Sequence, residues 1–180
     1  MSLFNGRDLT GWEHLGGGVV EVRDGMIHLE NDGSHRPGYL ATTACFGDFQ
    51  ARFRCKVLDG DSGLFFRAHR DPNHPDGLIG PQVQLHPSAD RGLGGLFETQ
   101  GRGWLCKPSQ SLVQSVLGKS DWLEGQVVLR GRSVCVVMNG VVTADWQDDG
   151  TMADAGCLAI QMHGAGCRVK WALLEVRGLP

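Results

Sequence analysis

The sequence predicts an all-β protein built as an antiparallel β-sandwich or jelly roll, and three observations carry this prediction. The chain has 27 glycines and one tyrosine among 180 residues and no long run of helix formers, which favours short strands joined by turns. Residues 49–57 alternate strictly between apolar and polar side chains, as a strand with one solvated face does. Strand-like segments recur at roughly 8–12 residue spacing with turn signals between them, which is typical of sandwiches.

Two hairpins are predicted from dipeptides that favour tight turns. Asp24-Gly25 joins residues 19–23 to 26–30, and Asn139-Gly140 joins 134–138 to 141–146. The other strands are expected at residues 63–68, 82–86, 126–130, 157–163 and 168–177. A loop rich in Pro, Asp and His is expected between the first two of these.

The last strand changes phase, because Val169 and Trp171 share one parity and Leu174 and Val176 the other. A β-bulge near Ala172 would reconcile the two halves. A helical turn is expected only within residues 108–118. Because the chain shows no repeat, low-complexity tract or linker, residues 1–180 are expected to form one domain.

Composition excludes several classes of partner. Lys and Arg total 17 against 20 Asp and Glu, a formal net charge of −3, so there is no electrostatic reason to expect nucleic acid or an anionic membrane. No apolar run approaches the roughly 18 residues of a membrane span. Without a visible signal peptide the protein is expected in the cytoplasm; a trimmed leader with periplasmic or secreted location, and the oligomeric state, stay open.

The six cysteines show no C-x-x-C pair and no zinc-like spacing. Several sit inside apolar strand patterns, where a thiol behaves as a small hydrophobic side chain. We therefore expect reduced cysteines, while leaving one disulfide open. No cofactor and no metal site are expected, although metal dependence is not decided by the sequence.

The stretch from Gly94 to Leu105 concentrates unusual chemistry. Four glycines surround Glu98, Arg102 and Trp104, and Gly101 and Gly103 permit a tight turn with positive φ. An indole face beside a guanidinium and a carboxylate is a common means of holding a sugar, so Arg102 and Trp104 are predicted to bind saccharide. The alternative is a hairpin turn whose Trp packs on the core and whose charges are solvated.

Segments spread over the whole chain resemble one family. They are Leu3-Phe4-Asn5-Gly6-Arg7-Asp8-Leu9-Thr10-Gly11-Trp12, Gly47-Asp48-Phe49, Ser62-Gly63-Leu64-Phe65-Phe66-Arg67-Ala68, Gln82-Val83-Gln84, the stretch 94–104, Val137-Met138-Asn139-Gly140 and Ile160-Gln161-Met162-His163-Gly164. In this order they resemble the bacterial 3-keto-disaccharide hydrolase domain family.

The resemblance implies a concanavalin A-like lectin/glucanase jelly roll that holds a saccharide or 3-keto-saccharide on a concave sheet face. The implied activity is cleavage of glycosides already oxidised to a ketone at sugar carbon 3. Such a ketone acidifies the proton on carbon 2, so a base removes it, the anomeric substituent leaves, and water then adds. This route needs one base, a group that stabilises the enolate, and an acid at the leaving oxygen.

Three residues are predicted to carry that chemistry. Glu98 is the first choice for the base, and His163 is an acid/base candidate because it is the titratable group on a strand face. Arg67 follows three apolar residues and is expected to point a fixed cation into the concave face. The alternatives are an Arg67 paired with an acidic neighbour and a His163 that is only a hydrogen-bonded structural residue.

Amides are predicted to line the saccharide site. Gln82, Gln84 and His86 share one parity on a strand, so their side chains face one side of the sheet. Gln161 shares its parity with His163. A solvated outer face is the rival interpretation of the first row.

The chain also departs from the family pattern. The resemblance implies an acid on the strand where this chain has Gln82-Val83-Gln84. If that acid is the base in other members, the role here has moved to Glu98 or His163, or catalysis has been lost. The alternative function is therefore a lectin-like module that binds carbohydrate without chemistry, since the fold alone supports both.

Overall fold

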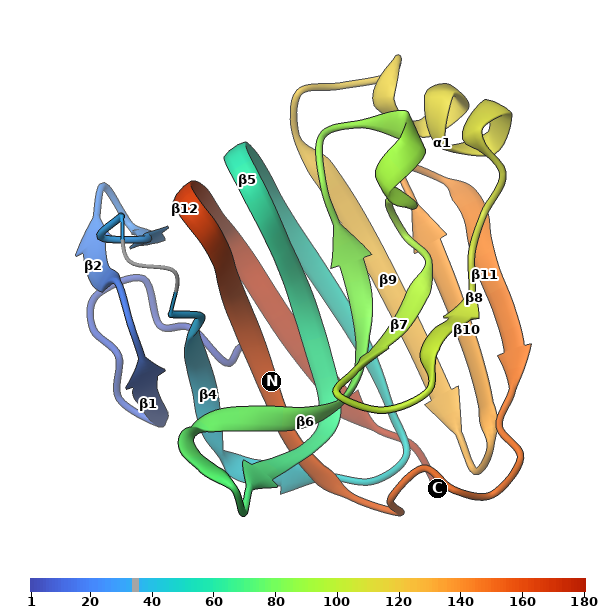
Figure 1. Ribbon diagram of the computed structural model, residues 1–180, viewed down its shortest axis with the longest axis horizontal. Coiled ribbons are helices and arrows are strands. Elements are labelled where there is room, and N and C mark those ends of the chain that lie inside the picture. The colour runs from blue at the N-terminus through green and yellow to red at the C-terminus, as the bar shows by residue number, and fades with distance from the viewer. Residues whose placement is uncertain (34–35) are drawn as a thin grey trace.

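Two long strands organise the molecule, which is shown in Figure 1 as a computed structural model describing residues 1–33 and 36–180. They are β5 (Phe49–Asp71) and β12 (Gly156–Gly178), each 23 residues long and paired antiparallel. Each strand contributes one half to each of two sheets, which pack face to face. The predicted all-β antiparallel sandwich is confirmed.

The first sheet contains the second half of β5 and the first half of β12. Its strand order is β1-β4-β12-β5-β6-β7-β8. The flanking strands are β1 (Trp12–Gly16), β4 (Gly38–Phe46), β6 (His74–Leu85), β7 (Leu96–Thr99) and β8 (Gly103–Cys106). This sheet carries the candidate site on its outer face.

The second sheet contains the other halves of the two long strands. The second half of β12 pairs with β3, and the first half of β5 pairs with β9. Beyond these, β2 pairs with β3 on one side, and β10 and then β11 follow β9 on the other. The flanking strands are β2 (Val19–Arg23), β3 (Met26–Glu30), β9 (Leu123–Arg130), β10 (Ser133–Met138) and β11 (Val141–Gln147). Because β5 and β12 are shared, the two sheets are covalently continuous at their centre.

Glycines allow each long strand to pass from one sheet to the other. Gly60 has φ 75° in β5, and Gly164 and Gly166 have φ 85° and 78° in β12. The pairing register of β12 with β5 shifts between His163 and Arg168. The sequence predicted separate strands on either side of these points, which was wrong because bulged pairing continues through the glycines.

Several local predictions are confirmed. Both hairpins form, with left-handed turn residues at Asp24 (φ 52°) and Asn139 (φ 47°), as two-residue turns require. The pairing of β12 with β5 shifts between Trp171 and Leu173, which places a bulge at Ala172. The predicted helical turn is α1 (Gln110–Leu117), which begins where Ser109 Oγ accepts a hydrogen bond from the Leu112 amide at 3.3 Å.

The one α-helix and the 3₁₀ turn η1 (Ala89–Arg91) lie together at one end of the sandwich (Figure 1). No helix in the described part of the chain has the length and apolar character needed to cross a membrane. The six cysteines are free thiols. Burial raises the pKa of the Cys157 thiol to about 11.

The loop predicted between residues 68 and 82 is instead a tight hairpin. Strand β5 continues to Asp71 and β6 begins at His74, with His69 opposite Ile79 and Arg70 opposite Leu78. The Asp71 carboxylate accepts a hydrogen bond from the Asn73 amide at 2.8 Å and so closes the turn. Cross-strand pairing overrides the local preference for a loop here.

Two apolar clusters follow from strand alternation. Leu64 and Phe66 point between the sheets and join the main core, in which Trp171 and Phe53 pack with ring centroids 5.3 Å apart. Phe65, on the opposite face of β5, joins a smaller cluster with Tyr39 on the outer face of the first sheet. This smaller cluster packs beside the candidate site, since Tyr39 belongs to both.

Candidate functional site

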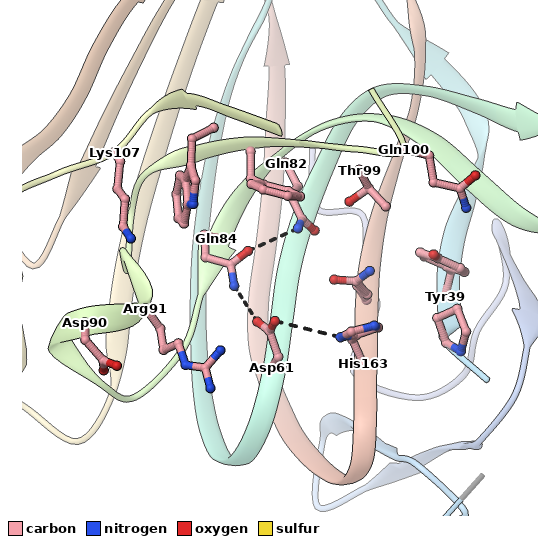
Figure 2. A pocket seen from close by; sticks show the side chains of 14 residues that line it. Tyr39, Asp61, Gln82, Gln84, Asp90, Arg91, Thr99, Gln100, Lys107 and His163 are labelled. Carbon is pink, nitrogen blue, oxygen red and sulfur yellow. Dashed lines mark hydrogen bonds and ion pairs between the residues drawn. The ribbon is translucent and has the colours of Figure 1, made fainter. Parts of the chain in front are cut away.

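A cavity of about 680 Å³ lies on the outer face of the first sheet, and Figure 2 shows the 14 side chains that line it. Its volume falls within the range of about 300–1,000 Å³ that is usual for small-molecule sites. Strands β4, β5, β6, β7, β8 and β12 contribute lining residues, together with η1.

The pairing register aligns these residues in rows across the sheet. One row runs from Tyr39 through Gln161 and Gly63 to Gln84. A second row contains Phe65, Gln82, Phe97 and Trp104. Because residues in one row share a face, strands distant in sequence deliver amide and aromatic side chains to one surface.

Asp61 and His163 form a pair at the centre of the cavity. They lie directly opposite each other on β5 and β12, and Asp61 Oδ2 is 3.9 Å from His163 Nδ1. Asp61 is half-buried, whereas His163 is the more exposed partner. The arrangement directs one ring nitrogen towards the carboxylate and leaves the other for a ligand.

A chain of amide hydrogen bonds ends on the same carboxylate (Figure 2). Gln82 Nε2 donates to Gln84 Oε1 at 3.1 Å, and Gln84 Nε2 donates to Asp61 Oδ1 at 2.5 Å. Both glutamines are buried. Since every donor points towards Asp61, the chain fixes the orientation of both amides and of the carboxylate.

Burial raises the pKa of the Asp61 carboxyl, while His163, His86, Gln84 and Arg91 act in the opposite direction. The net upward direction shows that removal from water outweighs the nearby positive charges and the hydrogen bond. A carboxylate with a raised pKa next to an imidazole is typical of acid/base sites. Among the described residues no three His, Cys, Asp or Glu side chains cluster as metal ligands would.

Gly63 makes room for the amide chain. It lies in the row between Gln161 and Gln84, and a Cβ atom at this position would overlap the side-chain carbonyl of Gln82. That carbonyl oxygen is buried and has no hydrogen-bond partner in the described part of the chain. The absence of a side chain at residue 63 is therefore a requirement of the site.

Tyr39 closes the side of the cavity formed by β4. Its ring packs edge-on against Phe65 with centroids 5.6 Å apart, and the Gln161 side chain is close enough to its hydroxyl to act on the pKa of that group. Burial raises the pKa of the Tyr39 hydroxyl, so this group stays protonated and can donate a hydrogen bond.

Trp104 lies at the opposite end of the cavity and is 38% exposed. Its ring packs edge-on against Phe97 with centroids 5.3 Å apart, and Lys107 Nζ lies 4.9 Å from the ring centroid. An indole supported at its edge and open on part of its surface can stack on the apolar face of a sugar ring.

Five of the predicted site residues come together in this cavity. They are Gln82, Gln84, Trp104, Gln161 and His163. The alternative of a solvated row is wrong for Gln82 and Gln84, which are buried. The roles of these five residues in binding and catalysis stay predictions.

Glu98 and Arg102 lie outside this cavity and neutralise each other. Arg102 Nε and Nη2 donate to the two Glu98 oxygens at 2.8 and 3.0 Å, and Arg102 Nη1 donates to Asp148 and Asp149, each at 2.9 Å. The Arg102 side chain, through its hydrogen bonds, lowers the pKa of the Glu98 carboxyl. A carboxylate so engaged is a poor base, so the geometry favours a structural part for this cluster.

Arg67 also turns away from the candidate site. Its guanidinium donates to Asp48 Oδ1 at 2.8 Å, the Gly131 carbonyl at 3.0 Å and the Gly47 carbonyl at 3.4 Å. Arg67 has φ 45° within a stretch where the pairing register of β5 shifts. The shift interrupts the alternation of side chains between the two faces of the sheet, on which the prediction for Arg67 depended. The alternative of an Arg67 paired with an acidic neighbour is the one observed.

Arg67 and Glu98 share a second, smaller cavity of about 200 Å³ next to the first. Its volume is below the usual range for a ligand site, and the charged groups of both side chains are already hydrogen-bonded. We therefore build the proposed chemistry on the larger cavity.

His86 follows the end of β6 and does not line the cavity. It is close enough to Asp61 to lower the pKa of that carboxyl. Its Nδ1 atom is buried without a hydrogen-bond partner among the residues described. His86 is thus near Asp61 without being part of the cavity wall.

Among the lining residues that sequence reasoning missed, four carry chemistry that matters to the site: Tyr39, Asp61, Arg91 and Lys107. Asp61 could have been found, because it directly precedes the family-like segment that begins at Ser62 and shares the parity of Gly63. The acid that is missing from β6 is supplied here by the neighbouring strand β5, where the Asp61 carboxylate accepts a hydrogen bond from Gln84. The other three offer no local signal.

Fold and site together define a β-sandwich with a cavity lined by amide, aromatic and titratable side chains on the outer face of one sheet. Residues 1–177 match the family described as 3-keto-alpha-glucoside-1,2-lyase-like domain. The chain belongs to this family, so it is a carbohydrate-active domain. No curated protein matches the sequence.

Solved structures support the fold. A protein from Parabacteroides distasonis named "putative glycosyl hydrolase" is 18% identical, with a TM-score of 0.69 over 99% of this chain and 93% of that one. A galectin-like protein from Bacillus subtilis is 16% identical, with a TM-score of 0.69 over 93% and 89%. The carbohydrate-binding module CBM66 from Bacillus subtilis is 13% identical, with a TM-score of 0.67 over 93% and 96%.

Proposed function

We propose that this domain cleaves 3-keto-glycosides by proton abstraction and elimination, with His163 as the base and Asp61 as its partner. The observation that carries the proposal is the Asp61–His163 pair, held at the floor of the cavity by the glutamine chain. Membership of a family described as 1,2-lyase-like supports an elimination.

In the proposed reaction His163 Nε2 removes the proton from carbon 2 of the sugar. Asp61 faces Nδ1 and so favours the tautomer with its proton on that nitrogen, which leaves Nε2 free to accept. The carboxylate also stabilises the imidazolium that forms. Burial raises the pKa of the Asp61 carboxyl, so its charged form is poorly solvated and an imidazolium forming beside it would stabilise that charge.

As the carbon–hydrogen bond breaks, negative charge moves to the oxygen on carbon 3. The Tyr39 hydroxyl and the Gln161 amide are neutral donors beside the pair and suit an enolate oxygen. The enolate then expels the substituent on carbon 1, giving a carbon 1–carbon 2 double bond. The imidazolium of His163 returns its proton to the leaving oxygen, and addition of water completes the predicted hydrolysis.

The second candidate is a lectin-like module, favoured by the exposed Trp104 ring and the buried amides, which suit binding without chemistry. One experiment distinguishes the two functions. The purified protein is mixed with a 3-keto-disaccharide and, separately, with its unoxidised parent, and release of free sugar is followed. Release from the ketone alone is expected; saturable binding of the parent with no release from either would establish the binding module instead.

Three variants and one control then locate the base. His163→Gln and Asp61→Asn are expected to lower kcat by about 10²–10⁴-fold, the usual contribution of acid/base catalysis, whereas Asp59→Asn is a control on an exposed aspartate of the same strand. Glu98→Gln tests the first sequence prediction. A loss for Glu98→Gln as large as for His163→Gln, with Asp61→Asn fully active, would return the role of the base to Glu98.

A further inference from the structure

One end of the cavity is marked by positive charge. Arg91 from η1 and Lys107 after β8 lie there with Asp90, while Tyr39 and Gln100 lie at the other end (Figure 2). Asp61 and His163 are between the two ends. A ligand that spans the cavity would therefore have one part over the acid/base pair and another beside the two cations.

In the described part of the chain these two cations are not held in ion pairs, although Arg91 is close enough to Asp61 and Asp90 to act on the pKa of both carboxyls. Neither has an acidic side chain within ion-pair distance among the residues described, in contrast to Arg102 and Arg67, which are fully engaged. Asp90 is the one acid at this end, and its carboxylate accepts a hydrogen bond from the Ser88 hydroxyl. The end keeps a net positive charge in a protein whose formal net charge is −3.

The chemistry of the two side chains indicates what they would bind. A guanidinium binds carboxylate and phosphate through two parallel hydrogen bonds, and an ammonium adds a point charge. Lys107 is held over the ring of Trp104, so a sugar or short chain lying on that indole would bring an attached anion to Lys107. A neutral disaccharide would use neither charge.

We infer that the cavity selects glycosides whose aglycone, the group on carbon 1, carries a carboxylate or phosphate. The orientation of the ligand, with its sugar over Asp61 and His163, rests on the proposed function. The anion would lie between Arg91 and Lys107, and the departing group would remain bound to these cations after elimination.

Calorimetry with unoxidised glycosides tests the inference without requiring any reaction. Methyl glucoside is the neutral probe, glucosylglycerate carries a carboxylate aglycone, and glucose 1-phosphate carries a phosphate. At low salt at least one anionic probe is expected to bind about tenfold more tightly than methyl glucoside, as one charge-assisted hydrogen bond provides. The advantage is expected to shrink as salt is added, and the tighter of the two anions identifies the group.

The double variant Arg91→Gln with Lys107→Gln is expected to bring the ratio of anionic to neutral affinity close to one. The matched control is Arg7→Gln with Arg177→Gln, which removes the same charge from exposed residues outside the cavity and should keep the ratio. Equal affinity for neutral and anionic glycosides, no binding of the anionic ones, or the same change in both double variants would overturn the inference.

The result is separable from the proposed reaction. A tenfold preference for an anionic glycoside in a protein that releases no sugar from 3-keto substrates would support the inference and refute the elimination. Cleavage of 3-keto-glycosides with no preference for an anionic aglycone would do the reverse.

Discussion

Asp61 is the residue on which the candidate site depends most. It faces His163, accepts the hydrogen bond that ends the glutamine chain, and is half-buried at the cavity floor. Burial disfavours its charged form and so raises its pKa. A carboxylate that is kept partly out of water for the sake of catalysis lowers the free energy of unfolding, as functional residues often do.

Replacing this carboxyl should stabilise the protein at neutral pH. Because the folded state binds the Asp61 proton more tightly than the unfolded state, stability falls as pH rises from the usual value near 3.8 through the raised pKa. Asp61→Asn removes that loss and keeps the acceptor for Gln84, so Tm at pH 7 should rise by about 2 °C.

Thermal unfolding of both proteins at pH 7 and at a pH well below 3.8 measures the effect, since the difference should disappear at the lower pH, where the wild-type carboxyl is protonated in both states. A variant less stable than the wild type at pH 7 would show that Asp61 is held as a favourable carboxylate.

At the scale of elements, pairing register decides which residues meet. The hairpin of β7 and β8 carries Trp104 over the site, and the Glu98–Arg102 cluster ties this hairpin to Asp148, just after β11. The ring of Trp146 lies 5.4 Å from the Arg102 guanidinium and completes the attachment. The cluster thus positions the aromatic end of the cavity.

Weakening this attachment should loosen saccharide binding without removing the acid/base pair. Arg102→Lys keeps the charge but loses the paired hydrogen bonds to Glu98, so we expect a loss of about 1–2 kcal/mol in unfolding free energy and a KM several-fold higher. The value of kcat should change little. Denaturant unfolding and steady-state kinetics measure the two effects; a loss confined to kcat would mean that Arg102 acts in the chemistry.

Gly63 provides a test of the row of residues that strand pairing aligns across the first sheet. Gly63→Ala would push the Gln82 side chain aside and break its hydrogen bond to Gln84, so activity should fall about tenfold or more through misplacement of the site. Gly178→Ala, at the end of β12 with open space around it, is the matched control. Equal activities of the two variants would show that the amide chain is dispensable.

At the scale of the whole molecule, β5 and β12 make one cooperative unit of two sheets. Neither sheet can lose its central pair without disturbing the other, because the same strands continue into both. We therefore expect unfolding in a single transition, as is usual for domains near this size.

The crossing point in β5 should be sensitive to substitution. Gly60 has φ 75°, and a Cβ atom there would lie 2.7 Å from the Cys167 Cα, so Gly60→Ala combines backbone strain with a steric clash and should cost about 2–4 kcal/mol of unfolding free energy. Gly6→Ala, with φ 79° in open space, isolates the strain alone. Denaturant unfolding followed by circular dichroism and by Trp fluorescence measures both the loss and the coincidence of transitions; equal losses would mean that close packing at Gly60 contributes nothing.

The sequence by itself determined the fold class, both hairpins, the bulge at Ala172 and the place of the helix α1, since alternation and turn dipeptides act over short distances. It also identified Gln82, Gln84, Trp104, Gln161 and His163 as one group of lining residues. These residues stand on regular strands, where parity is preserved.

Only the tertiary structure decided which charges are free for chemistry. Arg67 and Glu98 lie where the chain bends or turns. Asp48, 19 residues away, neutralises Arg67, and Arg102, four residues away across a turn, neutralises Glu98. Asp61 became part of the site because β5 and β12 pair in a register that places it opposite His163. Whether a charged side chain is exposed to a ligand therefore depends on long-range strand pairing, which no local sequence pattern encodes.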